Sequence, residues 1–114
     1  MGETPKSRTV HIDIGRDFSR ILGARFRKDG PYSGEEFRED ILEPAFVSCD
    51  RVVIALDSLS GFSASFFEEA FGGLVRKYGL AAVRSKIEFR AVERRYIVPK
   101  ITTWMEEAGK HADL

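Results

Sequence analysis

Cysteine is nearly absent from this chain, whose 114 residues include only Cys49. One cysteine permits no intramolecular disulfide and no Cys-x-x-Cys metal site, which favours a reducing compartment. The two histidines, His11 and His111, are too few and too far apart in the sequence to indicate a zinc site. We therefore expect neither a metal nor a cofactor.

The chain also lacks net charge, because 18 basic residues balance 18 acidic ones. Without a net positive field, nucleic-acid binding is not expected as the main activity. No apolar run is long enough to span a bilayer, and no polybasic tail would hold the chain on an anionic membrane. Residues 1–6 lack the apolar core of a signal peptide, so we expect a cytoplasmic protein.

What the chain does have is an ordinary globular composition, with 43% hydrophobic residues, in a length that fits one domain. Residues 1–6 are polar and include Pro5, which predicts a flexible tail. The domain is expected over residues 7–108, and residues 109–114 are expected to fray.

Alternating or continuous apolar residues predict four strands. Val10, Ile12 and Ile14 alternate with polar residues, and residues 86–92 alternate in the same way. Residues 51–57 are almost continuously apolar, which is typical of a central strand covered on both faces. Residues 21–27 form a further short candidate strand, which makes a mixed sheet of about four strands.

Three helices are predicted between and after these strands. The first begins at Ser33, which forms a capping box with Glu36, and Pro44 should kink or restart it near Glu43. The second has a capping box from Ser65 to Glu68, although Ser63 competes for the cap position. It ends at Gly79. The third carries an apolar stripe from Ile97 to Ala108. The order β-β-α-β-α-β-α predicts an α/β domain with helices packed on the sheet.

A glycine pair lies inside the second predicted helix, at Gly72-Gly73. Each glycine costs about 1 kcal/mol relative to alanine in a helix. We therefore expect the pair to allow close packing against a strand or another helix.

The turn that follows the central strand is the best candidate site. Ligands of open α/β sheets favour the carboxyl ends of strands, and a helix N-terminus accepts negative charge. A phosphate on Ser63 or Ser65 would add about −1.5 to −2 charges there. The plainer alternative is that these serines only cap the helix, and Glu68 and Glu69 would repel a phosphate.

The first quarter of the chain is locally basic, with Arg16, Arg20, Arg25, Arg27 and Lys28. A solvated face explains this pattern. The alternative is a docking patch for an acidic partner or a phosphate, for which Arg25 is the first candidate.

Two further functions stay open. A small hydrolase or transferase would use Asp57 and Ser63 or Ser65 with His11 as the base, and Asp13 would form a carboxylate pair with Asp57. However, the chain has no Gly-x-Ser-x-Gly elbow, Walker loop or His-Glu-x-x-His motif. An oligomeric structural subunit would use Phe62 and Phe66 as an exposed self-association patch.

Residues 23–38 and 56–74 resemble the family of STAS-like domains of unknown function, and the resemblance extends over roughly residues 8–105. That family is named for its similarity to the STAS domain of anti-sigma-factor antagonists. In those proteins a strand ends in aspartate, and an Asp-Ser-Ser-Gly turn opens a helix. A kinase with a histidine-kinase-type ATPase fold phosphorylates the second serine of that turn.

The resemblance implies a non-catalytic regulatory module that binds a protein partner, such as a kinase of that fold. Asp57 matches the strand-end aspartate, Ser65 the phosphorylated serine and Ser63 the turn aspartate. The turn of this chain differs, since it reads Ser-Ala-Ser-Phe. The expected partner-binding residues are Asp57, Ser58, Ser60, Gly61, Phe62, Ser63, Ser65, Phe66, Glu69 and Arg25.

Overall fold

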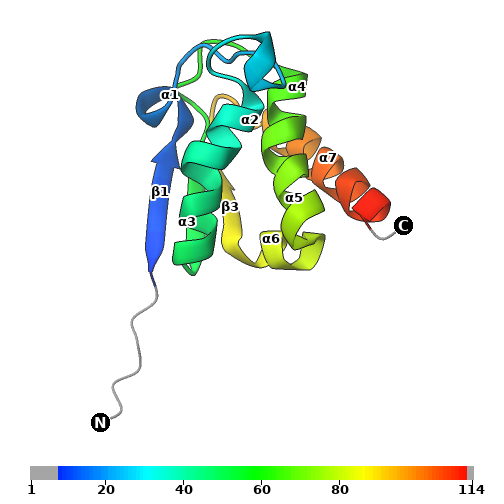
Figure 1. The fold of residues 1–114 in the computed structure, drawn as a ribbon. Coiled ribbons are helices and arrows are strands. Elements are labelled where there is room, and N and C mark those ends of the chain that lie inside the picture. Colours follow the sequence, from blue (N-terminus) through cyan, green and yellow to red (C-terminus); the bar gives the residue numbers. More distant parts are fainter. Residues whose placement is uncertain (1–7, 113–114) are drawn as a thin grey trace.

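A computed structural model of the chain describes residues 8–112 (Figure 1). The tail predicted for residues 1–6 lies outside the described residues. Three strands alternate with helical segments, among which η1 is a 3₁₀-helix and η2 and η3 are π-helical. In chain order the elements are β1 (Thr9–Asp13), α1 (Ile14–Asp17), η1 (Arg27–Asp29), α2 (Gly34–Phe37), η2 (Arg38–Leu42), α3 (Glu43–Ser48), β2 (Arg51–Ala55), α4 (Ala64–Phe67), η3 (Glu68–Gly72), α5 (Gly73–Tyr78), α6 (Leu80–Lys86), β3 (Ile87–Arg90) and α7 (Ile97–Ala112).

The described residues form a single three-stranded sheet in the order β1-β2-β3, and both strand pairs are parallel. Ile12 of β1 pairs with Ile54 of β2, which pairs with Phe89 of β3. The α/β class is confirmed, but the predicted mixed sheet of about four strands is wrong in both respects. Because all strands are parallel, their carboxyl ends meet at one edge of the sheet, the upper one in Figure 1.

The strand predicted at residues 21–27 does not form. The amide of Gly23 instead donates to the carbonyl of Tyr32 (2.8 Å). The amides of Gly34 and Glu35 donate to the carbonyls of Ala24 (2.9 Å) and Arg25 (3.0 Å). The first amides of a helix have no partner inside it, and this segment supplies acceptors for two amides at the start of α2. The segment is therefore bound to a helix terminus and not to the sheet.

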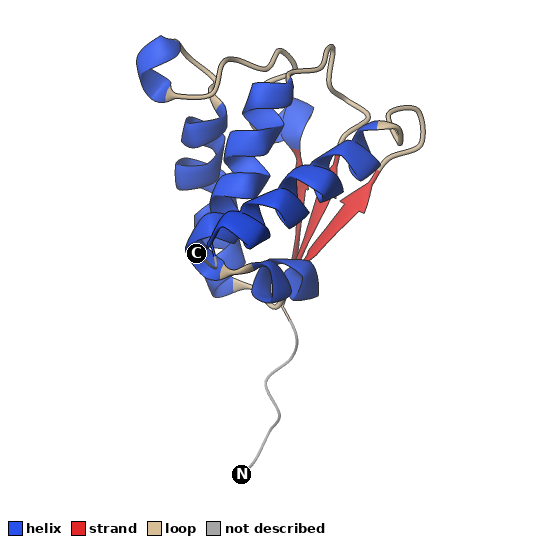
Figure 2. Ribbon diagram, turned by 90° about the vertical axis from the view of Figure 1, so that its right-hand side faces the viewer, coloured by secondary structure: helices blue, strands red, loops and turns tan. Residues whose placement is uncertain are grey.

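Figure 2 shows the helices gathered on one side of the sheet. Two long helical stretches of that layer, residues 34–48 and residues 64–78, each contain a π-helical turn, and α7 is a third long helix of 16 residues. The restart predicted near Glu43 is confirmed, since α3 begins at Glu43 directly after η2. Pro44 lies in the first turn of α3, directly after the π-helical turn η2, where the regular α-helical hydrogen bonding is already interrupted.

Both long stretches begin at a serine cap. The hydroxyl of Ser33 accepts a hydrogen bond from the Glu36 amide (3.0 Å), which confirms the predicted cap. The other half of the predicted capping box is wrong, because the Glu36 carboxylate accepts from the Tyr32 amide (3.0 Å) and not from that of Ser33. In the second stretch the cap is Ser63, whose hydroxyl accepts from the Phe66 amide (3.3 Å). The predicted capping box from Ser65 to Glu68 is therefore wrong, because the helix begins earlier, at Ala64.

The end of the second stretch is confirmed at Gly79, whose φ of 93° favours glycine. The short helix α6 follows at once and was not predicted. It leads into β3, which lies within the strand predicted over residues 86–92.

The core lies between the sheet and the helices and is rich in phenylalanine. The rings of Phe37 and Phe66 lie 5.7 Å apart, and those of Phe71 and Phe89 5.1 Å apart, which joins both long stretches and the sheet. Gly73 lies against another helix, as predicted, since an added Cβ would come within 2.6 Å of Arg38 Nε. Gly72 instead faces Glu68 of its own stretch.

Candidate functional site

A hollow lined mainly by polar residues lies at the carboxyl ends of the strands and has a volume of about 580 Å³. We call it the arginine hollow. Loops after all three strands contribute to it, because Arg20 follows β1, Ser58 follows β2 and Arg94 follows β3. The full lining is Gly15, Arg16, Arg20, Asp57, Ser58, Leu59, Ser60 and Arg94. The structure thus brings three of the predicted site residues together, namely Asp57, Ser58 and Ser60.

The Asp57 carboxylate holds the loop between β3 and α7. Its two oxygens accept hydrogen bonds from the amides of Arg94 (2.9 Å) and Val92 (2.8 Å). The bond from the Arg94 amide has the largest effect on the pKa of Asp57, and that from the Val92 amide follows. Both lower this pKa below its ordinary value, because they stabilise the ionised form. Asp57 is therefore an anchor that positions Arg94 beside the hollow.

The expected carboxylate pair of Asp13 and Asp57 does not form among the described hydrogen bonds. The Ser58 hydroxyl donates to the Asp13 carboxylate, which also accepts from the Arg16 amide (3.3 Å) at the start of α1. The two aspartates therefore make separate contacts. Asp13 joins the end of β1 to the loop after β2, and Asp57 joins the loop after β2 to the loop after β3.

Two smaller hollows continue from the arginine hollow across the loop after β2. The second measures about 240 Å³ and is lined by Ser60, which it shares with the first, and by Ile21, Leu22, Gly61 and Phe62. The third measures about 400 Å³ and is lined by Phe62, which it shares with the second, and by Ala64, Lys100, Thr103 and Trp104. We call the three hollows together the loop-edge surface.

Phe62 is the central apolar residue of the loop-edge surface. Its side chain is 44% exposed, and that of Ile21 is 72% exposed. The Phe62 ring lies 6.3 Å from the ring of Trp104 and 5.8 Å from that of Phe67, so it is held in place while one part of it faces solvent. The prediction of an exposed Phe62 is confirmed.

Phe66 and Glu69 do not belong to this surface, and the predicted exposure of Phe66 is wrong. Phe66 is 0% exposed and packs against Phe37. Glu69 is buried and forms an ion pair with Arg38 (2.8 Å). Both residues point from α4 and η3 into the neighbouring helical stretch, which the sequence spacing alone did not reveal.

The two candidate serines differ in their bonding. The Ser63 hydroxyl accepts from the Phe66 amide and donates to the Gly23 carbonyl (3.2 Å), so it ties the helix cap to the loop after β1. Ser65 is half-buried and its hydroxyl makes no hydrogen bond with the described residues. Modification of Ser63 would break two bonds, whereas modification of Ser65 would break none of those found.

The basic first quarter separates into paired and unpaired arginines. Arg25 forms an ion pair with Glu68, and Arg27 pairs with Glu39 (3.0 Å) and Asp40 (2.6 Å). Arg25 does not line the arginine hollow. Arg20 lines it, and so does Arg94, which we did not single out in the sequence. The sequence offered one signal for Arg94, namely its position shortly after a predicted strand. In a parallel sheet the residues that follow each strand lie at the same edge.

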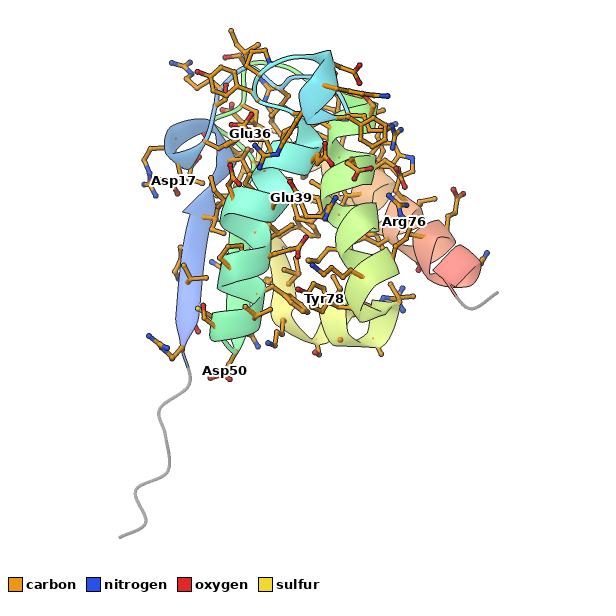
Figure 3. The ribbon with its side chains drawn as sticks, viewed as in Figure 1. Asp17, Glu36, Glu39, Asp50, Arg76 and Tyr78 are labelled. Atoms are coloured by element: carbon orange, nitrogen blue, oxygen red, sulfur yellow. The ribbon has the colours of Figure 1, made fainter. Side chains whose placement is uncertain are left out.

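Ion pairs of largely buried side chains join the two long helical stretches. Arg38 bridges Glu43 (2.6 Å) and Glu69 (2.8 Å), and Lys77 also binds Glu43 (2.7 Å). Figure 3 shows Arg76 and Tyr78 along one stretch and Glu39 on the other. Burial raises the pKa of Glu43, but the ion pairs with Lys77 and Arg38 outweigh it, and the pKa lies below its ordinary value.

The residues expected for catalysis are not brought into one hydrogen-bonded set within the described part of the chain. Asp57 binds two backbone amides, Ser63 binds Gly23 and Phe66, and His11 lies exposed in the middle of β1. Residues 8–112 also contain no cluster of three or more His, Cys, Asp or Glu side chains that could hold a metal ion. Within that range no helix is both long and apolar enough to cross a membrane.

Comparison with known proteins gave one family match. The family model described as a STAS-like domain of unknown function matches residues 33–94, which is more than half of the chain. The matched segment runs from the cap of α2 to the arginine after β3 and includes half of the residues that line the loop-edge surface, among them those of the loop after β2. Searches of curated proteins and of solved structures found no match.

Proposed function

This chain belongs to the family of STAS-like domains of unknown function, and we propose that it is a non-catalytic module that binds a protein partner at the loop-edge surface. The observation that carries the proposal is the continuity of the three hollows through Ser60 and Phe62. They combine exposed apolar side chains with arginines, the residue types that dominate binding energy in protein interfaces.

The chemistry of this surface defines the partner. Phe62 and Ile21 offer an apolar anchor, while Arg16, Arg20 and Arg94 offer positive charge beside it. A complementary partner presents an apolar side chain next to an acidic group. Of the residues predicted for binding, Asp57, Ser58, Ser60, Gly61 and Phe62 line the surface. Phe66 and Glu69 are buried outside it, and Ser63, Ser65 and Arg25 do not line it.

We further propose that the module is regulatory and acts in the cytoplasm. The candidate partner is a kinase with a histidine-kinase-type ATPase fold, as the resemblance to anti-sigma-factor antagonists implies. Ser65 is the favoured phosphorylation site, because its hydroxyl is not engaged by the described residues while that of Ser63 is. A phosphate on Ser65 would lie within one helical turn of Glu68, and repulsion there would disturb the ion pair of Glu68 with Arg25.

Site-specific crosslinking tests the docking site. A photoreactive phenylalanine analogue replaces Phe62 in one variant and Val47 in a control variant. Val47 is exposed on α3, away from the carboxyl ends of the strands. The expected result is a partner adduct, identified by mass spectrometry, from position 62 only. Equal adducts from both positions would refute the site, and an adduct with a second copy of the chain would establish the self-association alternative in its place.

The regulatory part is tested with the partner so identified. Phe62→Ala is expected to weaken its binding by at least about tenfold, and Val47→Ala is expected to leave it unchanged. Ser65→Asp should then change the affinity relative to Ser65→Ala. If wild type, Ser65→Asp and Ser65→Ala bind equally, the chain is a binder without a phosphorylation switch.

A further inference from the structure

The arginine hollow contains more positive charge than the surrounding residues neutralise. Three arginines and one aspartate line it. Both oxygens of that aspartate, Asp57, already accept backbone amides. Arg16 has a carboxylate partner in Asp17 (3.0 Å).

Arg20 and Arg94 have no carboxylate partner among residues 8–112. Within the described part of the chain, the guanidinium of Arg94 donates only to the Tyr96 hydroxyl (3.2 Å). Eight of the twelve arginines do form ion pairs, so the chain pairs this residue type readily elsewhere. Two unpaired arginines at the same hollow repel one another unless an anion lies between them.

The walls of the hollow are held in position by contacts between loops. The Ser60 amide donates to the Arg20 carbonyl (2.8 Å), which joins the loops after β1 and β2. Asp57 fixes the backbone of Arg94, as described above. Gly15 packs so closely on Ser58 that an added Cβ would overlap it. The arginines therefore project from backbone that is fixed on three sides, which lowers the entropy lost when they bind a ligand.

We propose that the arginine hollow binds the phosphate group of a small anionic ligand, with Arg20 and Arg94 as its principal contacts. Guanidinium groups present planar pairs of N–H donors that match the oxygens of a phosphate. A tetrahedral phosphate can accept from arginines that approach from different loops, and Ser60, whose hydroxyl is a further donor, lines the same hollow. The volume of about 580 Å³ also leaves room for a group attached to the phosphate.

The proposal goes beyond the proposed function and shares Arg20 and Arg94 with the partner surface, but it can be tested separately, because it concerns only the first of the three hollows. Phe62 does not line that hollow. Phe62→Ala is therefore expected to retain phosphate binding even where it loses the partner. Failure of one proposal can in this way be distinguished from failure of the other.

The test is a titration of the full chain with inorganic phosphate at constant ionic strength, followed by amide chemical shifts. Shifts are expected at Ser58, Ser60 and Arg94. Arg20→Gln and Arg94→Gln should each weaken binding by at least about tenfold. Arg8→Gln is the matched control, since it removes the same charge from an exposed residue at the opposite end of β1 and should leave the affinity unchanged.

Two results would overturn the proposal. One is that sodium chloride at equal ionic strength reproduces the shifts. The other is that Arg20→Gln and Arg94→Gln, both folded by circular dichroism, bind phosphate as tightly as the wild type. Parallel titrations with a nucleoside monophosphate and a sugar phosphate then identify the class of ligand that carries the phosphate. The natural class should bind more tightly than inorganic phosphate, and Arg20→Gln should weaken its binding in the same way.

Discussion

The guanidinium of Arg38 lies 2.8 Å from the carboxylate of Glu69 and joins the two long helical stretches at their π-helical turns. The side chains are 13% and 9% exposed, so the pair is almost fully removed from solvent. Arg38 also binds Glu43 (2.6 Å), and Gly73 provides the space in which its side chain lies. Arg38 thus links two buried carboxylates, one in each of the two helical stretches.

Arg38→Met should destabilise the fold by about 2–3 kcal/mol, because it removes the shortest ion pair of Glu69 and one of the two cations that bind Glu43. The free energy of unfolding in urea measures the loss. Adding Glu43→Gln and Glu69→Gln to the same variant should restore most of the stability, since neutral amides cost less to bury. A loss under about 1 kcal/mol in the single variant would contradict this account.

Gly34→Ala should destabilise the protein by about 1–3 kcal/mol through overpacking. An added Cβ would overlap the Phe66 carbonyl, where the starts of α2 and α4 meet. Gly61→Ala is the control, because nothing lies within 4 Å of a Cβ there, and it should change stability by under about 0.5 kcal/mol. Thermal unfolding compares the two variants, and equal effects would contradict the predicted contact.

Ser63→Ala and Ser65→Ala distinguish the helix cap from its neighbour. Ser63→Ala removes the bond to the Phe66 amide and should cost about 1 kcal/mol. Ser65→Ala removes no bond found among the described residues and should have an effect within about 0.5 kcal/mol. Urea denaturation of both variants measures the difference, and a larger loss for Ser65→Ala would place the cap at Ser65.

Stability should fall in acid as Glu43 becomes protonated. The pKa of Glu43 lies below its ordinary value of 4.5, so its ion pairs stabilise the fold fully above that value. This contribution is lost as the pH falls through the lowered pKa of the folded state. Glu43→Gln should be less stable at neutral pH and should show a shallower decline below about pH 5. Parallel declines in the two proteins would show that Glu43 contributes nothing to the pH dependence.

Asp57→Ala should loosen the loop between β3 and α7. The amides of Val92 and Arg94 lose their acceptor and should exchange hydrogen faster, which two-dimensional NMR detects. Asp50→Ala is the control, because Asp50 accepts from the Arg8 amide (2.8 Å) at the other end of the sheet. It should speed exchange at Arg8 and leave Val92 unchanged, and unaltered exchange at Val92 and Arg94 in Asp57→Ala would contradict the anchoring role.

Local pattern predicted the elements whose signals lie within a few neighbouring residues. The cap at Ser33, the restart at Glu43, the stop at Gly79 and the strands at residues 9–13 and 51–55 all depend on such signals. The segment of residues 21–27 misled the prediction, because its apolar residues resemble a strand while its carbonyls accept the first amides of α2. That competition between partners distant in the sequence cannot be read from the segment itself.

The sequence by itself determined the α/β class, the family and the candidate turn after β2, because periodicity, helix caps and motif residues act over short distances. Only the tertiary structure decided which side chains reach the surface. It buried Phe66 and Glu69, paired Arg25 with Glu68, and left Arg20 and Arg94 together at one hollow. The physical reason is that burial and charge pairing depend on the chain segments brought together by the fold, and the parallel sheet brings the loops after all three strands to a single edge.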